Sequence, residues 1–242
     1  MPEQDLVMLE RREGWAEIAI NRPERRNSII PPVSVAIADA LDEVADDEDI
    51  ACVLLRGEGG YFCSGVDLKA LQAVPPPLWR GEHGTSWRDL HLKMFSYPKP
   101  VVCAFEKYGI NAGAALAMAC DILIAGATAF IQVGEVQQGA MAPMNLAWFR
   151  IKTTEQSLAR LAFYGDRIAG PDMLRLGLAA ECVADDQVLA RCREVCQRFA
   201  EFPAGATARI KRGIIEQRGI DDPEAYFRKP SSNALLGAKM VK

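Results

Sequence analysis

A stretch of very small residues stands where a helix is expected to begin. Residues 109–121 read GINAGAALAMACD, with no acidic, basic or nucleophilic side chain before Asp121. Small residues at a helix start allow close packing against a neighbouring element. They also leave the unpaired N–H groups of the first helical turn, at the positive end of the helix dipole, open to an approaching oxygen atom. The stretch alone leaves open whether it serves close packing or supplies backbone N–H groups for chemistry.

Three other motifs that could carry chemistry fail on residue type. Gly57-Glu58-Gly59-Gly60 begins like the phosphate-binding pattern GxGxxG, but Phe62 takes the place of the third glycine. Ser64 resembles the serine of the hydrolase pattern GxSxG, but Phe62 stands where that pattern requires its first glycine. Cys63 needs a neighbouring base to act as a nucleophile, and nothing in the sequence brings either histidine of the chain close to it. The two histidines are also not spaced with other residues that could bind a metal ion. We therefore expect a packed thiol at Cys63 and no metal site.

The amino-acid composition indicates the general class of protein. Half of the 242 residues are apolar and a quarter are charged, with a net charge of −4, which is typical of a globular domain with a sizeable core. The acidic balance argues against a nucleic-acid partner. The sequence shows neither an apolar run of membrane-spanning length nor the basic and apolar regions of a signal peptide, so we expect no membrane partner. The seven cysteines form no CxxC pair and lie largely in apolar runs, which is typical of reduced thiols in a cytoplasmic protein.

The elements that must position these groups alternate between strands and helices. The expected order is a hairpin at 6–21, a helix at 34–46, a strand at 52–60, a loop and helix at 62–72, a long loop at 73–90, strands at 98–109 and 121–126, and helices over much of 146–211. Strand, helix and strand in this rhythm predict crossover units with parallel pairing.

Four segments in this order resemble the enoyl-CoA hydratase/isomerase (crotonase) family. They are INRPERRNS (20–28), FCSGVDL (62–68), GINAGAALAMACD (109–121) and GDRIAG (165–170) leading to LGL (176–178). The resemblance implies an α/β fold, a spiral of repeated ββα units over 1–190, followed by a helical trimerisation region over 191–242. It implies an acyl-CoA substrate, with coenzyme A present only as part of that thioester and no other cofactor. It also implies a homotrimer or a dimer of trimers.

The resemblance further implies an oxyanion hole made of two backbone amides. By position these belong to Val66, after the glycine of FCSGVD, and to Ala112. The family's hydratases add two glutamates that activate water; the first position holds Ala115, which cannot transfer a proton, and the second holds Glu135. A single carboxylate beside a stabilised enolate suits a 1,3-proton transfer, so we expect 3,2-enoyl-CoA isomerisation with Glu135 as the base. Its valine neighbours are expected to desolvate Glu135 and raise its pKa.

Contacts to coenzyme A follow from the same resemblance. Arg25 and Lys69 are expected to bind its phosphates, and backbone groups around Ser64, Val66 and Leu68 its adenine and pantetheine parts. The loop at 73–90, with Trp79 and Trp87, is expected to cover the acyl chain.

The sequence departs from the family pattern at three places. Glu106-Lys107 replaces the usual Asn-Gly before the small-residue helix. Residues 139–145 read GAMAPMN and lack the usual Pro-Gly turn. The aromatic and basic residues at 226–230 come early, so the closing helices look shortened.

Three functions remain open on these residues. The first is an isomerase that uses Glu135. The second is a hydratase or hydrolase-like enzyme with a displaced acid such as Glu106. The third is a catalytically silent acyl-CoA binder, or an RNA-associated relative that keeps the fold alone, although the acidic net charge weighs against RNA.

Overall fold

A six-stranded sheet forms the main layer of the computed structural model, which describes residues 5–231. The strand order is β1-β2-β3-β4-β6-β9. The strands are β1 (Val7–Arg11), β2 (Ala16–Ile20), β3 (Val53–Gly57), β4 (Val101–Phe105), β6 (Ile122–Gly126) and β9 (Glu181–Val183). The first two pair antiparallel as the predicted hairpin, and all later pairs are parallel. The prediction of crossover units with parallel strands is confirmed.

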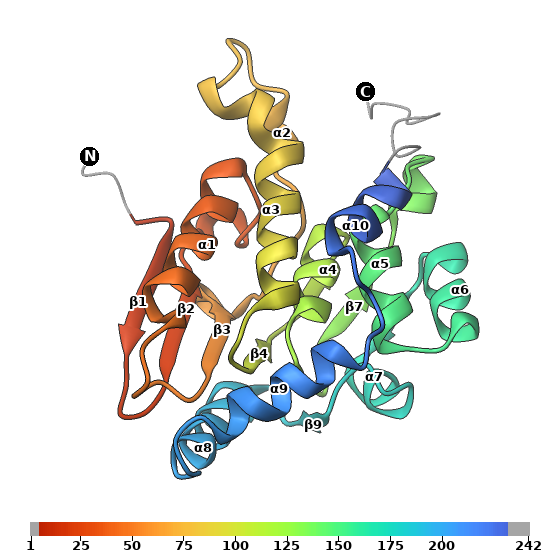
Figure 1. The fold of residues 1–242 in the computed structure, drawn as a ribbon. Helices are drawn as coiled ribbons and strands as arrows, with labels where there is room; N and C mark the ends of the chain where they lie inside the picture. The colour runs from red at the N-terminus through yellow and green to blue at the C-terminus, as the bar shows by residue number, and fades with distance from the viewer. Residues whose placement is uncertain (1–4, 232–242) are drawn as a thin grey trace.

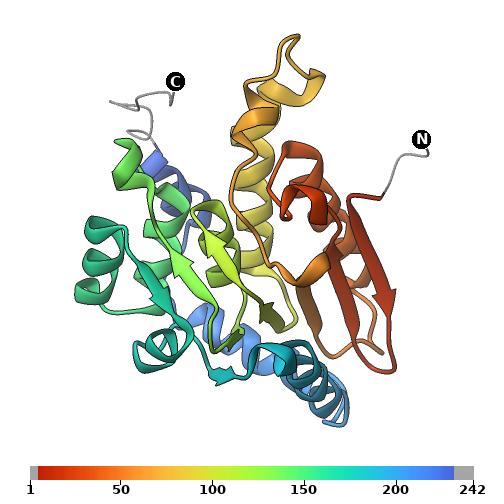
Figure 2. The same ribbon diagram turned by 180° about the vertical axis from the view of Figure 1, so that it is seen from behind.

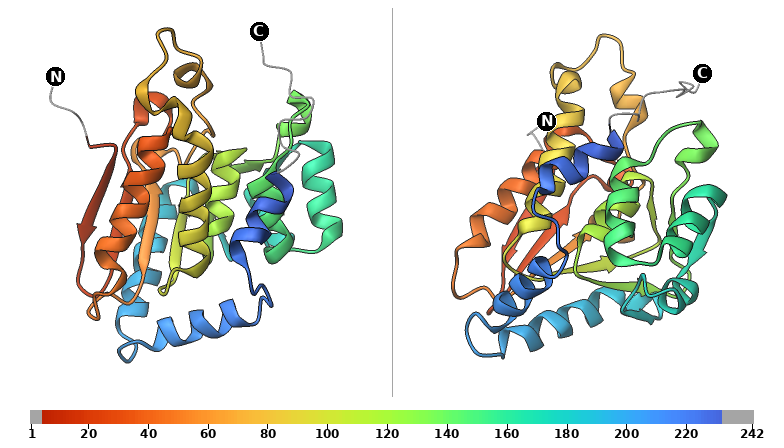
Figure 3. Two further views of the ribbon diagram at one scale, coloured as in Figure 1. Left: turned by 45° about the horizontal axis from the view of Figure 1, so that its top comes forward. Right: turned by 45° about the vertical axis from the view of Figure 1, so that its right-hand side comes forward.

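Helices cover both faces of this sheet (Figures 1 and 3). Within the described chain they are α1 (Pro31–Ala45), α2 (Leu68–Leu71), α3 (His83–Ser96), α4 (Ala112–Ala119), α5 (Pro143–Lys152), α6 (Glu155–Tyr164), α7 (Gly170–Arg175), α8 (Val188–Ala200), α9 (Ala206–Glu216) and α10 (Pro223–Ser231). None of them is both long and apolar enough to cross a bilayer. On β4, Cys103 and Phe105 face the core shared with α1 and α3, whereas Val102 and Ala104 pack against α8.

A smaller sheet carries the segments on which the site depends (Figure 2). It consists of β5 (Tyr108–Ile110), β7 (Phe130–Gln132) and β8 (Arg167–Ala169). β5 and β7 are parallel neighbours, so their carboxyl ends meet at one edge. The successions β4-β5-α4 and β6-β7-α5 are the expected ββα units.

The prediction of a loop across 73–90 was wrong in its second half, because α3 already begins at His83. Trp87, Leu90, His91 and Met94 form a buried stripe at helical spacing, and their packing outweighs the turn-forming prolines that precede them. Trp87 contacts the ring of His91 edge-on, with centroids 4.2 Å apart. It is therefore a core residue and not part of a covering loop, whereas Trp79 lies in the short turn η3 (Leu78–Glu82) and packs on the edge of the core.

The C-terminal helices complete the core. α10 packs on α5 and α3, and the buried ring of Phe227 lies 5.3 Å from that of Trp148 and 5.8 Å from that of Phe95. The boundary predicted at residue 190 falls inside α8, and the division into two regions stays a prediction; residues 232–242 of the second region lie outside the described residues. The seven cysteines are unpaired and all but Cys182 are buried, as expected.

Candidate active site

Two backbone amides have no acceptor in the described chain, one at the start of α4 and one in the segment beside it. Asn111 precedes the helix with φ +52° and ψ −109°, a strained backbone conformation outside the left-handed helical region. Ala112 is the first helical residue, and its amide has no acceptor within residues 5–231. The same holds for the amide of Val66, in the segment that runs alongside. Both amides can therefore donate to an incoming oxygen atom.

Backbone hydrogen bonds hold the Val66 segment against α4. The amide of Cys63 donates to the Tyr108 carbonyl at 3.1 Å, and the amide of Ile110 donates to the Cys63 carbonyl at 3.2 Å. The approach leaves no room for side chains. A Cβ on Gly113 would lie 2.3 Å from the Cys63 carbonyl oxygen, and one on Gly65, at φ +98°, would lie 2.8 Å from the Ile110 carbonyl oxygen. Close packing is thus the means by which this stretch brings two donor segments together.

Glu135 begins a short turn (η4, Glu135–Gln138) that follows β7. Its Oε1 accepts a hydrogen bond of 2.9 Å from Nδ2 of Asn145, and its Oε2 is buried with no partner in the described chain. Burial raises the pKa of Glu135 to about 7, although hydrogen bonds from its own backbone amide and from Asn145 oppose the rise. The expected desolvation of this carboxyl group is confirmed. Such a group accepts and returns a proton near neutral pH.

Asn111 links Glu135 to the start of α4. Its Oδ1 accepts from the amide of Gly134 at 2.8 Å, and its carbonyl accepts from Nδ2 of Asn145 at 3.0 Å. Its own amide donates to the carbonyl of Gln132 at the end of β7. The structure therefore brings Glu135 and Ala112 together through two asparagines that the sequence motifs did not single out. The only signal for Asn145 is an amide within the apolar residues of α5.

Ala115 and Glu106 are the two other positions considered for a catalytic acid. Ala115 is completely buried within α4, so no carboxyl group stands at the position of the family's first glutamate. Glu106 follows β4, and its charged neighbours include Arg56 and Glu58. Its charge also influences the thiol of Cys192 on α8. Glu106 thus belongs to the α8 side of the main sheet and not to the start of α4.

The residues expected to bind coenzyme A lie around the turn after β2 and the start of α2. Arg25 forms a two-point ion pair with Asp67, and Ser64 contacts the Arg25 carbonyl at 3.5 Å. Leu68 and Lys69 are exposed on the first turn of α2. Their roles toward coenzyme A stay predictions.

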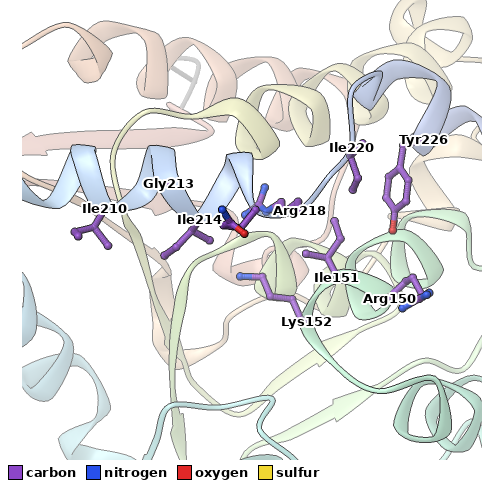
Figure 4. Close-up of a pocket in the computed structure, with 10 residues that line it drawn as sticks. Arg150, Ile151, Lys152, Ile210, Gly213, Ile214, Arg218, Ile220 and Tyr226 are labelled. Carbon is purple, nitrogen blue, oxygen red and sulfur yellow. The ribbon is translucent and has the colours of Figure 1, made fainter.

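A cavity of about 800 Å³ lies elsewhere, between α5, α9 and α10 (Figure 4). Its walls combine apolar side chains such as Ile151 and Ile214 with the cations of Lys152 and Arg218. Neither Glu135 nor the two amide donors line it. This cavity is a feature separate from the candidate active site.

The sequence matches the family described as enoyl-CoA hydratase/isomerase over residues 10–227, and the chain belongs to that family. It is 31% identical to enoyl-CoA hydratase EchA19 of Mycobacterium tuberculosis over 91% of this chain and 84% of that protein. It is 27% identical to 1,2-epoxyphenylacetyl-CoA isomerase of Escherichia coli, over 87% of this chain and 82% of that protein. The crystal structure of carnitinyl-CoA hydratase from Mycobacterium avium is similar with a TM-score of 0.85 and 26% identity, covering 98% of this chain and 92% of that one. The protein is thus an enoyl-CoA hydratase/isomerase-type enzyme with the crotonase fold.

Proposed function

We propose that the protein catalyses the 3,2-isomerisation of enoyl-CoA thioesters. Glu135 removes a proton from C2 of a 3-enoyl thioester, and the electron pair moves into a dienolate. The amides of Val66 and Ala112 stabilise the negative charge on its thioester oxygen, a contribution typically worth about 3 kcal/mol per donor. Glu135 then returns the proton to C4, which leaves the double bond between C2 and C3.

The observation that carries this proposal is the buried Oε2 of Glu135, which has no partner in residues 5–231, beside the helix start at Ala112, whose amide likewise has no acceptor there. Hydration needs a second group to share the handling of water and proton. Ala115 cannot supply it, and the charged neighbours of Glu106 are Arg56, Glu58 and Lys107 rather than Glu135. Isomerisation needs one carboxylate alone.

The test compares two substrates with the purified protein. We expect trans-3-hexenoyl-CoA to be converted to the conjugated 2-enoyl thioester at least ~10²-fold faster than crotonyl-CoA is hydrated. Glu135→Gln should reduce isomerisation by ~10²-fold or more, since the amide has the size of the acid but cannot accept the proton. Efficient hydration of crotonyl-CoA, or full activity of Glu135→Gln, would place the chemistry on other residues. Binding of octanoyl-CoA in calorimetry without turnover of either substrate would favour the silent acyl-CoA binder.

Coenzyme A recognition is the second part of the proposal. The free edge of the Arg25 guanidinium and the exposed Lys69 supply positive charge for the phosphates, and backbone groups near Ser64 and Leu68 bind the adenine and pantetheine parts. Lys69→Ala should weaken octanoyl-CoA binding in calorimetry. It should leave binding of octanoyl-pantetheine, which lacks the nucleotide phosphates, unchanged.

Assembly as a homotrimer or a dimer of trimers completes the proposal. α9 exposes Ile210 and Ile214 by 69% and 52% of their surfaces. Exposed apolar residues one helical turn apart are typical of a surface that another chain covers. We also propose a cytoplasmic location, which the unpaired thiols support.

A further inference from the structure

Asn145 is a buried amide in an apolar helix. Only 2% of its surface is exposed, and its neighbours Met144, Ala147 and Trp148 belong to the hydrophobic core. Its Oδ1 is buried with no partner among the described residues, which is unfavourable for folding. Asparagine is also a poorer helix former than leucine or methionine. Packing and stability alone would favour an apolar residue here.

The amide nitrogen of Asn145 makes two hydrogen bonds that join the two halves of the proposed chemistry. Nδ2 donates to Oε1 of Glu135 at 2.9 Å and to the carbonyl oxygen of Asn111 at 3.0 Å. Both acceptors are oxygens that lack a proton of their own when Glu135 is ionised. The opposite orientation of the amide would face its oxygen toward both of them, so the chemistry fixes the orientation.

We propose that Asn145 is the positioning residue of this site: it selects Oε2 of Glu135 as the oxygen that carries the proton and holds that carboxyl group against the Asn111–Ala112 peptide. The inference rests on the proposed isomerisation. It adds a residue outside the expected set of Glu135, Val66 and Ala112.

The first half of the argument concerns Glu135. Because Oε1 receives the N–H of Asn145, a proton that enters the carboxyl group sits on Oε2. Within the described chain Oε2 is buried and has no hydrogen-bond partner, so its lone pairs are not committed to another protein group. A carboxyl group held at one oxygen cannot rotate freely, and orientation of this kind contributes strongly to proton transfer.

The second half concerns the oxyanion donor. The carbonyl of Asn111 and the amide of Ala112 belong to the same peptide unit. A hydrogen bond to the carbonyl of a peptide polarises it and strengthens its N–H as a donor. Asn145 therefore supports the Ala112 amide from the far side of the peptide while it holds the base. The bond also lowers the pKa of Glu135, so its loss leaves a more basic carboxyl group.

The experiment compares Asn145→Leu, Asn145→Asp and the control Met144→Leu in the full-length protein. The readouts are the pH dependence of kcat and the KM for trans-3-hexenoyl-CoA. We expect Asn145→Leu to lower kcat by about 10–100-fold with little change in KM, and to move the ionisation midpoint upward by roughly one pH unit. Asn145→Asp keeps the shape of the side chain and adds a like charge beside Glu135, so its midpoint should rise further. Met144→Leu repacks the same helix with little change in volume and should leave the midpoint in place.

A second measurement reads Glu135 without substrate. The carboxyl group is titrated by NMR in protein labelled with ¹³C at the glutamate side-chain carboxyl, and the signal that Glu135→Gln removes identifies it. An upward shift of the Glu135 midpoint in both Asn145 variants supports the inference, and an unchanged midpoint with unchanged kcat overturns it. If Asn145→Leu fails to fold, Asn145→Asp carries the test. Full activity of Glu135→Gln would instead remove the proposed function, whatever the Asn145 variants show.

Discussion

Arg25 binds Asp67 through two parallel hydrogen bonds, from Nη2 to Oδ1 at 2.7 Å and from Nε to Oδ2 at 3.1 Å. Asp67 also accepts from Nη2 of Arg22 at 3.1 Å and from the amide of Ala70 at 3.0 Å. One buried carboxylate thus fixes both the turn after β2 and the first turn of α2. Because Val66 directly precedes Asp67, the same contacts hold the segment that carries one of the two free amides.

Asp67→Asn should destabilise the protein and weaken its activity. It leaves two arginines without their common carboxylate; the lowered pKa of Asp67 corresponds to about 2 kcal/mol at most, and solvent at the exposed Arg25 screens part of it. Urea unfolding measures the loss. Asp42→Asn removes the exposed pair with Lys93 and should cost less than about 1 kcal/mol. Equal losses in the two variants would contradict the role assigned to Asp67.

The contribution of Asp67 should depend on pH in the acid range. Burial alone would raise its pKa, but hydrogen bonds from Arg25, Ala70 and Arg22 outweigh burial and hold the pKa at about 2. A lowered carboxyl pKa stabilises the folded state above the unfolded value of about 4, and this stabilisation is lost as the pH falls toward 2. The difference in unfolding free energy between the wild type and Asp67→Asn should therefore shrink from pH 5 to pH 2.5. A constant difference would show that Asp67 acts as an uncharged spacer.

Glu135→Gln should stabilise the protein at alkaline pH. The pKa of Glu135 is raised to about 7 by burial, so the folded state loses stability as the pH rises from about 4.5 and the loss levels off above 7. The shift corresponds to about 3 kcal/mol at most, and the buried amide of glutamine offsets part of the gain. We expect Glu135→Gln to be more stable by about 1–3 kcal/mol at pH 8.5 and nearly equal to the wild type at pH 5.

Gly113→Ala and Gly213→Ala form a matched pair of helical glycine substitutions. At Gly113 the new Cβ would lie 2.3 Å from the Cys63 carbonyl oxygen, whereas at Gly213 no atom lies within 4 Å. Gly113→Ala should cost about 1–3 kcal/mol and lower isomerase activity at least ~10-fold, because it separates the two amide donors. Gly213→Ala should raise stability by about 0.5–1 kcal/mol, since alanine favours a helix interior. Thermal unfolding and steady-state rates of both variants decide the matter.

Ile214→Glu should prevent the proposed trimer from forming. It places a charge on the exposed apolar row of α9, where burial without a partner is costly. Light scattering coupled to gel filtration should show a trimer for the wild type and a smaller species for this variant. Leu78→Glu, at a fully exposed apolar residue of η3, should leave the assembly intact. A monomeric wild type at micromolar concentration would refute the trimer.

The sequence predicts those parts of the fold that follow from local patterns. The hairpin of β1 and β2 and the buried parallel strands β3, β4 and β6 appear as apolar runs that end at turn residues. The short strands β7, β8 and β9 were missed, because three residues at 130–132, 167–169 or 181–183 give no measurable period. The start of α3 was missed since Pro75-Pro76-Pro77 gives a strong local turn signal. The packing of Trp87 and His91 stabilises the helix, and this packing depends on the tertiary fold.

The residues of the candidate site also fall into those that the sequence predicts and those that depend on the tertiary structure. The family resemblance assigns positions to Glu135 and Ala115, whose roles stay predictions, and the valine neighbours of Glu135 predict its desolvation. Asn145 could not be placed from the sequence, because its contact with Glu135 depends on the rotation of α5 about its axis. Glu106 was an acceptable alternative acid in the sequence, and only the alternation along β4 shows that it continues the face covered by α8.

The reactivity of the buried cysteines can be used to follow local unfolding of the protein. Six thiols are shielded in the core, whereas Cys182 at β9 is partly exposed, and burial raises the pKa of Cys63 to about 12. An alkylating reagent that needs the thiolate should therefore modify Cys182 first and the other six only when their surroundings open. Cys52 and Cys196 report the face under α8, and Cys63 reports the contact between the Val66 segment and α4. Pulse alkylation followed by peptide mass spectrometry would then show, without any engineered label, whether the Val66 segment separates from α4 before the rest of the molecule unfolds.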